Sequence, residues 1–164
     1  MHTQRIEWLQ GMPIFGAIRA DALECLLESA PTIEVETGDY YFREGDEAAC
    51  MFVLESGGAA VLKRWEGRQH LLRRLASGDC FGEMSILDLQ PRSASVQAES
   101  PCRALRITPA DLYRLCHRDA EQFAVIQMNI GREVCRRLRA TDEMLFRTAM
   151  GEMPVVVPEV YRPG

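Results

Sequence analysis

The sequence lacks closely spaced cysteines. No Cys-x-x-Cys pair occurs, although metal and iron–sulfur sites usually bring at least two ligands close together in the chain. The six cysteines are Cys25, Cys50, Cys80, Cys102, Cys116 and Cys135. We expect scattered, reduced and buried thiols, as in a cytosolic protein. The histidines His2, His70 and His117 show no metal-ligand spacing and are expected on the surface or in packing roles.

Long apolar runs and an excess of basic residues are also missing. The longest apolar run, residues 48–54, has seven residues, which is too short to span a membrane. The first residues form no signal peptide, so we expect a cytoplasmic protein without membrane contact. The formal net charge is −5, which disfavours sequence-independent nucleic-acid binding. No nucleophile elbow, metalloprotease motif or Walker loop is present, so neither an enzyme nor a prosthetic group is expected.

What the chain does have is the composition of one soluble domain. Its 164 residues are 47% hydrophobic and 26% charged, enough to build a core without disulfides. Residues 1–30 show helical spacing of apolar positions, and the period changes to alternation at Thr32. Short apolar segments follow, separated by glycine turns, at 32–36, 40–43, 51–55, 59–65, 70–75, 95–98 and 103–107. This pattern predicts an antiparallel sandwich or barrel flanked by helices.

Two helices are predicted after the strands. Thr108, Pro109 and Asp111 are typical of a helix start. Asp119 is placed to cap a second helix, with Gln122 as its capping-box partner, that runs to about Ala149. Its apolar stripe is Ile126, Ile130, Val134, Leu138 and Leu145.

The stripe of the long helix has two possible partners. Steps of four residues do not make a sustained heptad, so the stripe could pack on the chain's own barrel. A homodimer formed through residues 120–148 is the alternative that we favour. The prolines at 154, 158 and 163 mark residues 149–164 as a flexible tail, whose other possible role is to dock on a partner or a sheet edge.

The segment 81–96 does not fit a plain succession of strands. A short helix is predicted at Glu83–Leu89, directly after a glycine, and helix starts favour anions. Arg92 suits bidentate phosphate binding, and Ser93 and Ala94 add donors. Glu83, an acceptor when ionised, suits a sugar hydroxyl. These groups together describe a site for a phosphorylated sugar, unless Glu83 and Arg92 simply pair with each other in a polar loop.

The whole segment resembles the phosphate-binding cassette of the cyclic-nucleotide-binding domain. The resemblance extends over about residues 12–148 and includes residues 44–46, 52–57 and 75–79. That family includes bacterial catabolite activators, regulatory subunits of cyclic-nucleotide-dependent kinases and gated channels. It implies an eight-stranded antiparallel jelly-roll β-barrel with N-terminal helices and a C-terminal helical lid. A haem-based sensor of the same fold is disfavoured by the intact cassette.

The resemblance also implies roles for individual residues. Gly82 and Glu83 would bind the ribose 2′-hydroxyl, and Arg92 would pair with the cyclic phosphate. The full set of implied ligand-binding residues is Phe81, Gly82, Glu83, Met84, Ser85, Arg92, Ser93, Ala94, Thr141 and Asp142. Thr141 falls where a base-contacting threonine lies in the catabolite activators, whereas Asp142 replaces their serine.

The expected ligand is cAMP, with cGMP as the alternative. Both Ser93 and Asp142 are compatible with guanine, because a hydroxyl and a carboxylate can accept from its amino and imino groups. Asp142 is equally well explained as a solvated acid on the helix face, with Arg139 as a partner within reach. We favour cAMP because it is the commoner ligand among similar bacterial domains.

We therefore expect a stand-alone cyclic-nucleotide sensor that repositions its C-terminal helices and signals to an unidentified protein partner. One domain, residues 1–148, would comprise helices at 1–30, the barrel at 31–108 and helices at 109–148. About sixteen residues follow Thr148, too few for a helix-turn-helix, so direct DNA binding is not expected. The alternative is a constitutive interaction or scaffold protein that keeps the fold without using the pocket.

Overall fold

The computed structural model describes residues 2–152 and 159–162. Three short N-terminal helices precede the strands: α1 (His2–Gln10), the 3-10 turn η1 (Pro13–Phe15) and α2 (Ala20–Leu27). The strands are β1 (Thr32–Val35), β2 (Tyr40–Phe42), β3 (Met51–Ser56), β4 (Ala59–Trp65), β5 (Arg68–Leu75), β6 (Cys80–Phe81), β7 (Ser95–Ala98) and β8 (Cys102–Ile107). Helix α3 (Met84–Asp88) lies between β6 and β7, and α4 (Pro109–Arg118) and α5 (Ala120–Ala149) follow β8.

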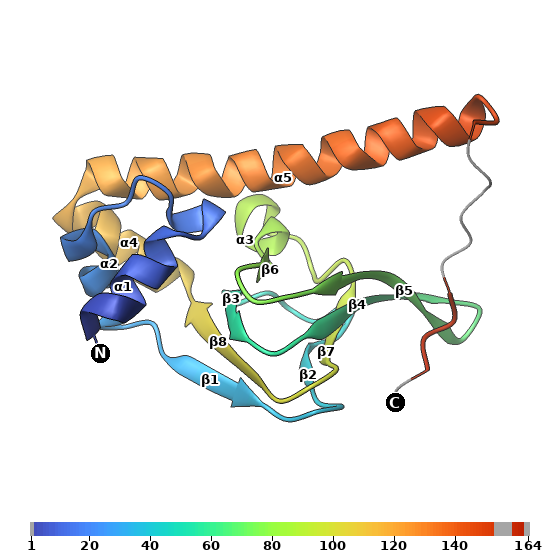
Figure 1. Cartoon of the computed structure of the whole chain (residues 1–164), viewed down its shortest axis with the longest axis horizontal. Helices are drawn as coiled ribbons and strands as arrows, with labels where there is room; N and C mark the ends of the chain where they lie inside the picture. Colours follow the sequence, from blue (N-terminus) through green and yellow to red (C-terminus); the bar gives the residue numbers. More distant parts are fainter. Residues whose placement is uncertain (1, 153–158, 163–164) are drawn as a thin grey trace.

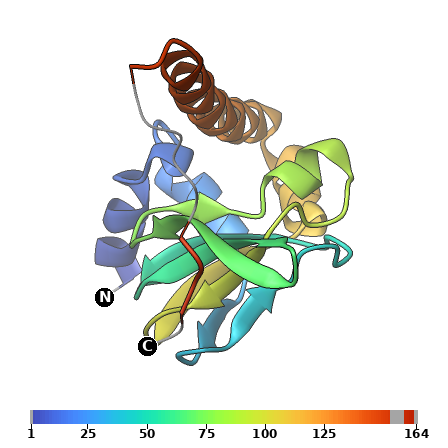
Figure 2. The same ribbon diagram turned by 90° about the vertical axis from the view of Figure 1, so that its right-hand side faces the viewer.

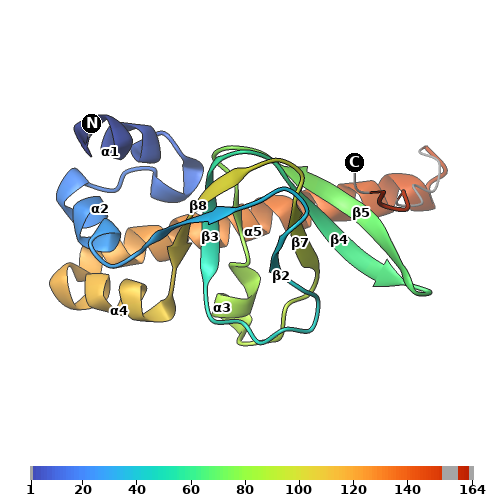
Figure 3. The same ribbon diagram turned by 90° about the horizontal axis from the view of Figure 1, so that it is seen from below.

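The eight strands form two antiparallel sheets, which confirms the predicted jelly-roll class. One sheet has the order β1-β8-β3-β6 and the other β2-β7-β4-β5. Within the described residues no strand pairing joins the two sheets, so the barrel is not closed. Figure 3 shows the sheets facing each other with α3 at one end of the strands.

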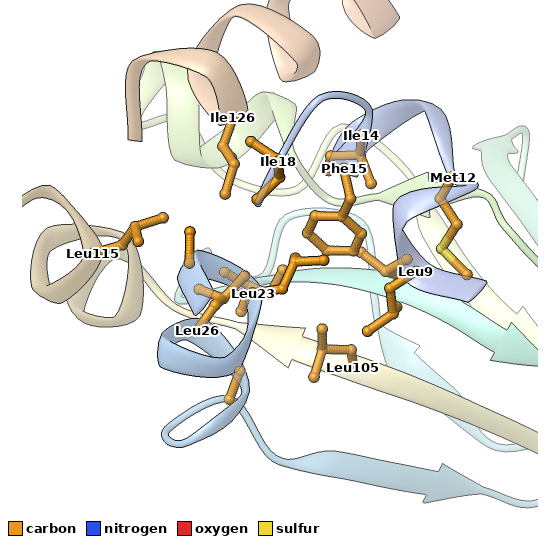
Figure 4. Packing of buried hydrophobic residues seen from close by; sticks show 14 of the residues in the cluster. Leu9, Met12, Ile14, Phe15, Ile18, Leu23, Leu26, Leu105, Leu115 and Ile126 are labelled. Carbon is orange, nitrogen blue, oxygen red and sulfur yellow. The ribbon is translucent and has the colours of Figure 1, made fainter. Parts of the chain in front are cut away.

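Two hydrophobic clusters hold the domain together. One lies between the sheets and includes Phe52, Leu54, Phe81 and Val96. The other joins the N-terminal helices to α4, α5 and one sheet, and Figure 4 shows its centre, where Phe15 points towards Leu23 and Leu105. The helices therefore pack against the sheet that carries β6, directly before the cassette.

The N-terminal half of α5 is fixed to the domain. Asp119 caps the helix by accepting from the Gln122 N–H at 3.0 Å. The predicted reciprocal role of Gln122 is wrong, because its side-chain oxygen accepts instead from the Arg19 N–H at 2.7 Å. The buried amide of Asn129 donates to the carbonyls of Ile14 and Gly16. These contacts fix α5 against the N-terminal helices.

The C-terminal half of α5 extends away from the domain. The predicted inward stripe holds for Ile126 and Ile130, which are each 1% exposed, but Leu138 is 58% and Leu145 63% exposed. Figure 1 shows the helix running along the whole length of the molecule, above the strands. The stripe fails as a packing face because the domain offers no surface to the last turns of a helix of 30 residues.

After α5, the described residues 159–161 contact the edge of one sheet. Of the expected tail, Ala149 ends α5, and residues 153–158 and 163–164 lie outside the described residues. Residues 159–161 run beside β5 (Figure 2). No helix in the described part of the chain is long and apolar enough to cross a membrane.

The cysteines differ sharply in exposure, which gives a first testable prediction. Cys50 and Cys80 are buried and Cys135 is exposed on α5. Burial raises the pKa of the Cys50 thiol and raises that of Cys80 to about 12. Since only the thiolate reacts, a thiol reagent at pH 8 should modify Cys135 rapidly and Cys80 only as the protein unfolds.

Mass spectrometry of time-resolved labelling would measure these rates. In denaturant all six thiols should react alike. Labelling of Cys80 in native protein at the rate of Cys135 would contradict the burial that the structure gives it.

Candidate functional site

The cassette is held in place by the turn that precedes β3. The N–H of Gly45 donates to the carbonyl of Arg92 at 2.9 Å, and the N–H of Arg92 donates to the carbonyl of Asp46 at 2.9 Å. Asp46 in turn accepts from the Arg43 N–H, which closes the turn. The motif at residues 44–46 thus positions the backbone of the arginine corner.

The guanidinium of Arg92 is buried and oriented by three groups. It donates to the carbonyl of Gly82 at 2.9 Å and to the carbonyl of Cys50 at 2.5 Å. Its carbon lies 4.0 Å above the ring of Phe42, within the range of a cation–π interaction. Only 4% of Arg92 is exposed, and burial lowers its pKa from the usual value. It carries no carboxylate partner among the described residues, so it is a preorganised cation available to an anion.

Gly82 allows this approach of the guanidinium. Its φ is +76°, in the left-handed region that favours glycine. A Cβ at this position would lie 2.6 Å from Nη1 of Arg92. The glycine before Glu83 is therefore needed both for its backbone conformation and for the space that Arg92 occupies.

We expect Gly82→Ala to displace Arg92 and lower the stability of the domain. Alanine at positive φ costs about 1 kcal/mol, and the guanidinium must also move. Thermal unfolding measures the loss, and Gly67→Ala is a matched control because Gly67 also has positive φ (+74°) but has nothing within 4 Å of its Cβ position. Equal destabilisation by the two variants would show that the contact with Arg92 has no effect.

Glu83 is the most buried acid of the described residues, with 1% exposure. One carboxylate oxygen, Oε1, accepts from Nη1 of Arg137 on α5. Arg137 also donates to the carbonyl of Cys80 at 2.5 Å and to Glu133 at 3.0 Å. The expected alternative, a direct pair between Glu83 and Arg92, is not what the structure shows. The long helix instead reaches the cassette through Arg137.

Two buried polar atoms of the cassette have no partner within the described residues. They are Oε2 of Glu83 and Nε of Arg92. Buried polar groups are normally hydrogen-bonded, so an unpaired acceptor and an unpaired charged donor in one segment need an explanation. A ligand that offers a hydroxyl and an anionic oxygen supplies both missing partners.

A third arginine, Arg73 on β5, contributes charge to the same region. Burial lowers its pKa, as does the nearby charge of Arg137, while Glu83 and Asp79 act in the opposite direction. Its half-buried side chain has no hydrogen bond or ion pair with another residue in the described ranges. Glu83 thus lies in the field of Arg92 and of Arg73.

The structure places the remaining expected site residues in two groups. Phe81 and Ala94 are buried in the cluster between the sheets, and Ser85 is buried in α3. Met84 and Ser93 are exposed. All five lie on the cassette around Glu83 and Arg92.

Thr141 and Asp142 are not brought to this cluster. Both are exposed on α5, one turn beyond Arg137, and the Thr141 hydroxyl donates to the Arg137 carbonyl at 3.0 Å. Their assignment to the base stays a prediction.

Sequence reasoning missed Arg137 and Arg73 as site residues. Arg137 was one of several arginines on a helix face, where solvated side chains are the default. The position of Arg137 on the helix could have indicated that it faces the domain. Arg137 lies three to four residues from both Glu133 and Val134, which are only partly exposed. No comparable pattern marked Arg73, which is one of three arginines of β5 together with Arg68 and Arg74.

The two four-stranded sheets and the buried Glu83 and Arg92 define a β-type ligand-binding domain. A family model described as cyclic nucleotide-binding domain matches residues 32–119, and the chain belongs to this family. This confirms the resemblance stated for the cassette.

Several known proteins are similar to the chain. The CRP-like cAMP-activated global transcriptional regulator of Mycobacterium tuberculosis (H37Rv) is 28% identical over 86% of this chain and 62% of its own length. The cAMP-dependent protein kinase regulatory subunit of Emericella nidulans is 29% identical over 61% of this chain and 24% of its own. The solved Thermus thermophilus catabolite activator protein is 26% identical with a TM-score of 0.74, over 84% of this chain and 63% of that one.

The similarity covers a domain rather than whole relatives. The chain spans about a quarter of the length of the fungal kinase regulatory subunit. A cyclic nucleotide-binding domain from Methylobacillus flagellatus, 19% identical, shares the fold with a TM-score of 0.78 over 98% of this chain and 86% of that one.

Proposed function

We propose that the chain is a cyclic-nucleotide sensor without enzymatic activity, with cAMP as its first candidate ligand. One observation carries the proposal: Oε2 of Glu83 and Nε of Arg92 are buried and unpaired in the part of the chain that the structure describes. The ribose 2′-hydroxyl would donate to Glu83, and the cyclic phosphate would accept from Arg92. Glu83 acts here as a ribose ligand and not as a general base.

The same contacts offer a route from ligand to output. Glu83 has two carboxylate oxygens, of which Arg137 uses one and leaves the other for the ribose. A ligand bound to Glu83 therefore changes the carboxylate that holds Arg137. Because Arg137 lies on α5, the exposed half of that helix is affected as well. We infer that the C-terminal helices change position on binding and present a changed surface to a protein partner.

cGMP is the second candidate, and Arg73 is the observation that favours it. In a 3′,5′-cyclic nucleotide the base and the phosphate leave the ribose at opposite ends. Arg92 and Arg73 both lie in the field of Glu83, so a second guanidinium without a carboxylate partner among the described residues lies near the proposed ribose ligand. Arginine donates well to O6 and N7 of guanine, whereas adenine offers a donor in place of O6.

Calorimetric titration with cAMP and cGMP separately, with 5′-AMP as control, tests the proposal. Micromolar or tighter binding of one cyclic nucleotide is expected. Arg73→Ala should weaken cGMP more than cAMP. Absence of heat and of thermal stabilisation with both, on protein free of co-purified nucleotide, would favour the scaffold alternative, because a ligand of the native state must raise its stability.

We further propose a homodimer through α5. Its second half carries Leu138 and Leu145, which are exposed and lie seven residues apart. Cys135 lies on this half as well. Heptad spacing of exposed apolar residues is typical of a helix pair.

Sedimentation of the wild type and of Leu138→Glu tests the helix pair. We expect a dimer that the charge dissociates, with oxidative cross-linking through Cys135 lost in parallel. Arg139→Glu, a charge change at the next position of the helix, is the control. A monomeric wild type at micromolar concentration would reject the dimer.

A further inference from the structure

The outer edge of β5 is covered by the chain's own C-terminal residues. β5 is the last strand of the order β2-β7-β4-β5. The N–H of Leu71 donates to the carbonyl of Glu159 at 2.9 Å, and the N–H of Tyr161 donates to the carbonyl of Gln69 at 2.8 Å. Val160 lies opposite His70 in an antiparallel bridge. This is the hydrogen-bond pattern of an added strand.

The side chains around this edge make it a defined surface. A groove of about 400 Å³ lies where Leu71 and Arg74 of β5 meet residues 159–162. Tyr161 is half-buried there, and burial raises its pKa. The side-chain oxygen of Gln69 accepts from the hydroxyl of Tyr40 at 3.1 Å. An exposed edge strand invites pairing with other chains, so covering it has a physical purpose.

We propose that the outer edge of β5 is a strand-addition site and that residues 159–162 of this chain occupy it as a strap on α5. Nine residues lie between Ala149 and Glu159, so a docked strap keeps the end of α5 within about 35 Å of β5. α5 carries Arg137, which contacts Glu83, and β5 carries Arg73. The strap thus joins the two elements that flank the proposed nucleotide site.

The regulatory part of this inference rests on the proposed function. If docking of the strap favours the position of α5 in which Arg137 reaches Glu83, strap and nucleotide are coupled. Coupling of this kind is reciprocal: the nucleotide strengthens docking by the same factor by which docking strengthens nucleotide binding.

Hydrogen exchange at the Leu71 amide tests the strap in protein without nucleotide. Tyr161→Pro removes the N–H that donates to Gln69, and a chain ending at residue 158 removes the strand altogether. Tyr161→Pro removes one of the two backbone hydrogen bonds and the truncation removes both, and each change should speed exchange at Leu71 by about tenfold or more. Val160→Ala, which keeps both backbone bonds, is the matched control.

The exchange experiment tests the docking of the strap separately from its coupling to nucleotide binding. Unchanged exchange at Leu71 in both variants overturns the strap. Protection that falls on dilution of the wild type assigns the strand to a second copy and overturns docking within one chain. Neither result depends on whether the protein binds a nucleotide.

A second measurement tests the coupling. Dissociation of cAMP or cGMP, whichever binds, should be about fivefold or more faster from the truncated chain than from the wild type. Loss of Leu71 protection with an unchanged dissociation rate overturns the regulatory part. Failure of both nucleotides to bind overturns the proposed function and leaves the exchange result standing.

Discussion

Arg92→Ala is expected to weaken binding of the cyclic nucleotide by about 30-fold or more. Arg92 is the one buried cation among the described residues that has no carboxylate partner, and the phosphate would lose it. Leaving a buried charge unpaired costs about 2–5 kcal/mol, and each 1.4 kcal/mol is a factor of ten in affinity. Titration calorimetry of the variant beside the wild type gives the ratio directly.

The controls separate lost binding from lost folding. Arg92 also holds the carbonyls of Gly82 and Cys50, so the thermal unfolding of the variant must be recorded. Arg92→Lys keeps the charge but cannot reach both carbonyls, and it should also bind weakly. Arg103→Ala removes an exposed arginine that pairs with Glu34, and should bind as the wild type does. Wild-type affinity in a folded Arg92→Ala would contradict the assignment of the phosphate site.

Most of the fold was predictable because its information is local. Seven of the strands are short apolar segments, most of them next to a glycine turn, and each was predicted within a few residues of its observed bounds. β6 has two residues and shows no period of its own. The end of the packed part of α5 was not predictable, since it depends on where the rest of the domain stops and not on the helix sequence.

The site was predictable in part for the same reason. Gly82, Glu83 and Arg92 belong to one contiguous segment whose residue types match one chemistry. Arg137 lies 54 positions from Glu83 in the sequence, and only the fold shows that they meet. A charged residue on a helix face does not indicate which distant residue it pairs with, so long-range ion pairs cannot be predicted from the sequence alone.

Arg137→Ala should lower the stability of the domain by about 3 kcal/mol. Glu83 has 1% and Arg137 22% side-chain exposure, so the loss leaves a buried carboxylate without its cation. For a chain of this length that corresponds to a fall in Tm of about 6–12 °C. Arg136→Ala is the matched control: it removes the neighbouring arginine, whose exposed pair with Glu133 is worth at most about 1 kcal/mol.

A double-mutant cycle decides whether the pair itself is responsible. Glu83→Gln removes the buried charge while keeping the shape of the side chain, so the double variant should be more stable than Arg137→Ala alone. Additive effects of the two substitutions would mean that Glu83 and Arg137 do not interact in solution. In that case α5 would have no ionic link to the cassette, and ligand binding at Glu83 would have to reach the helix by another route.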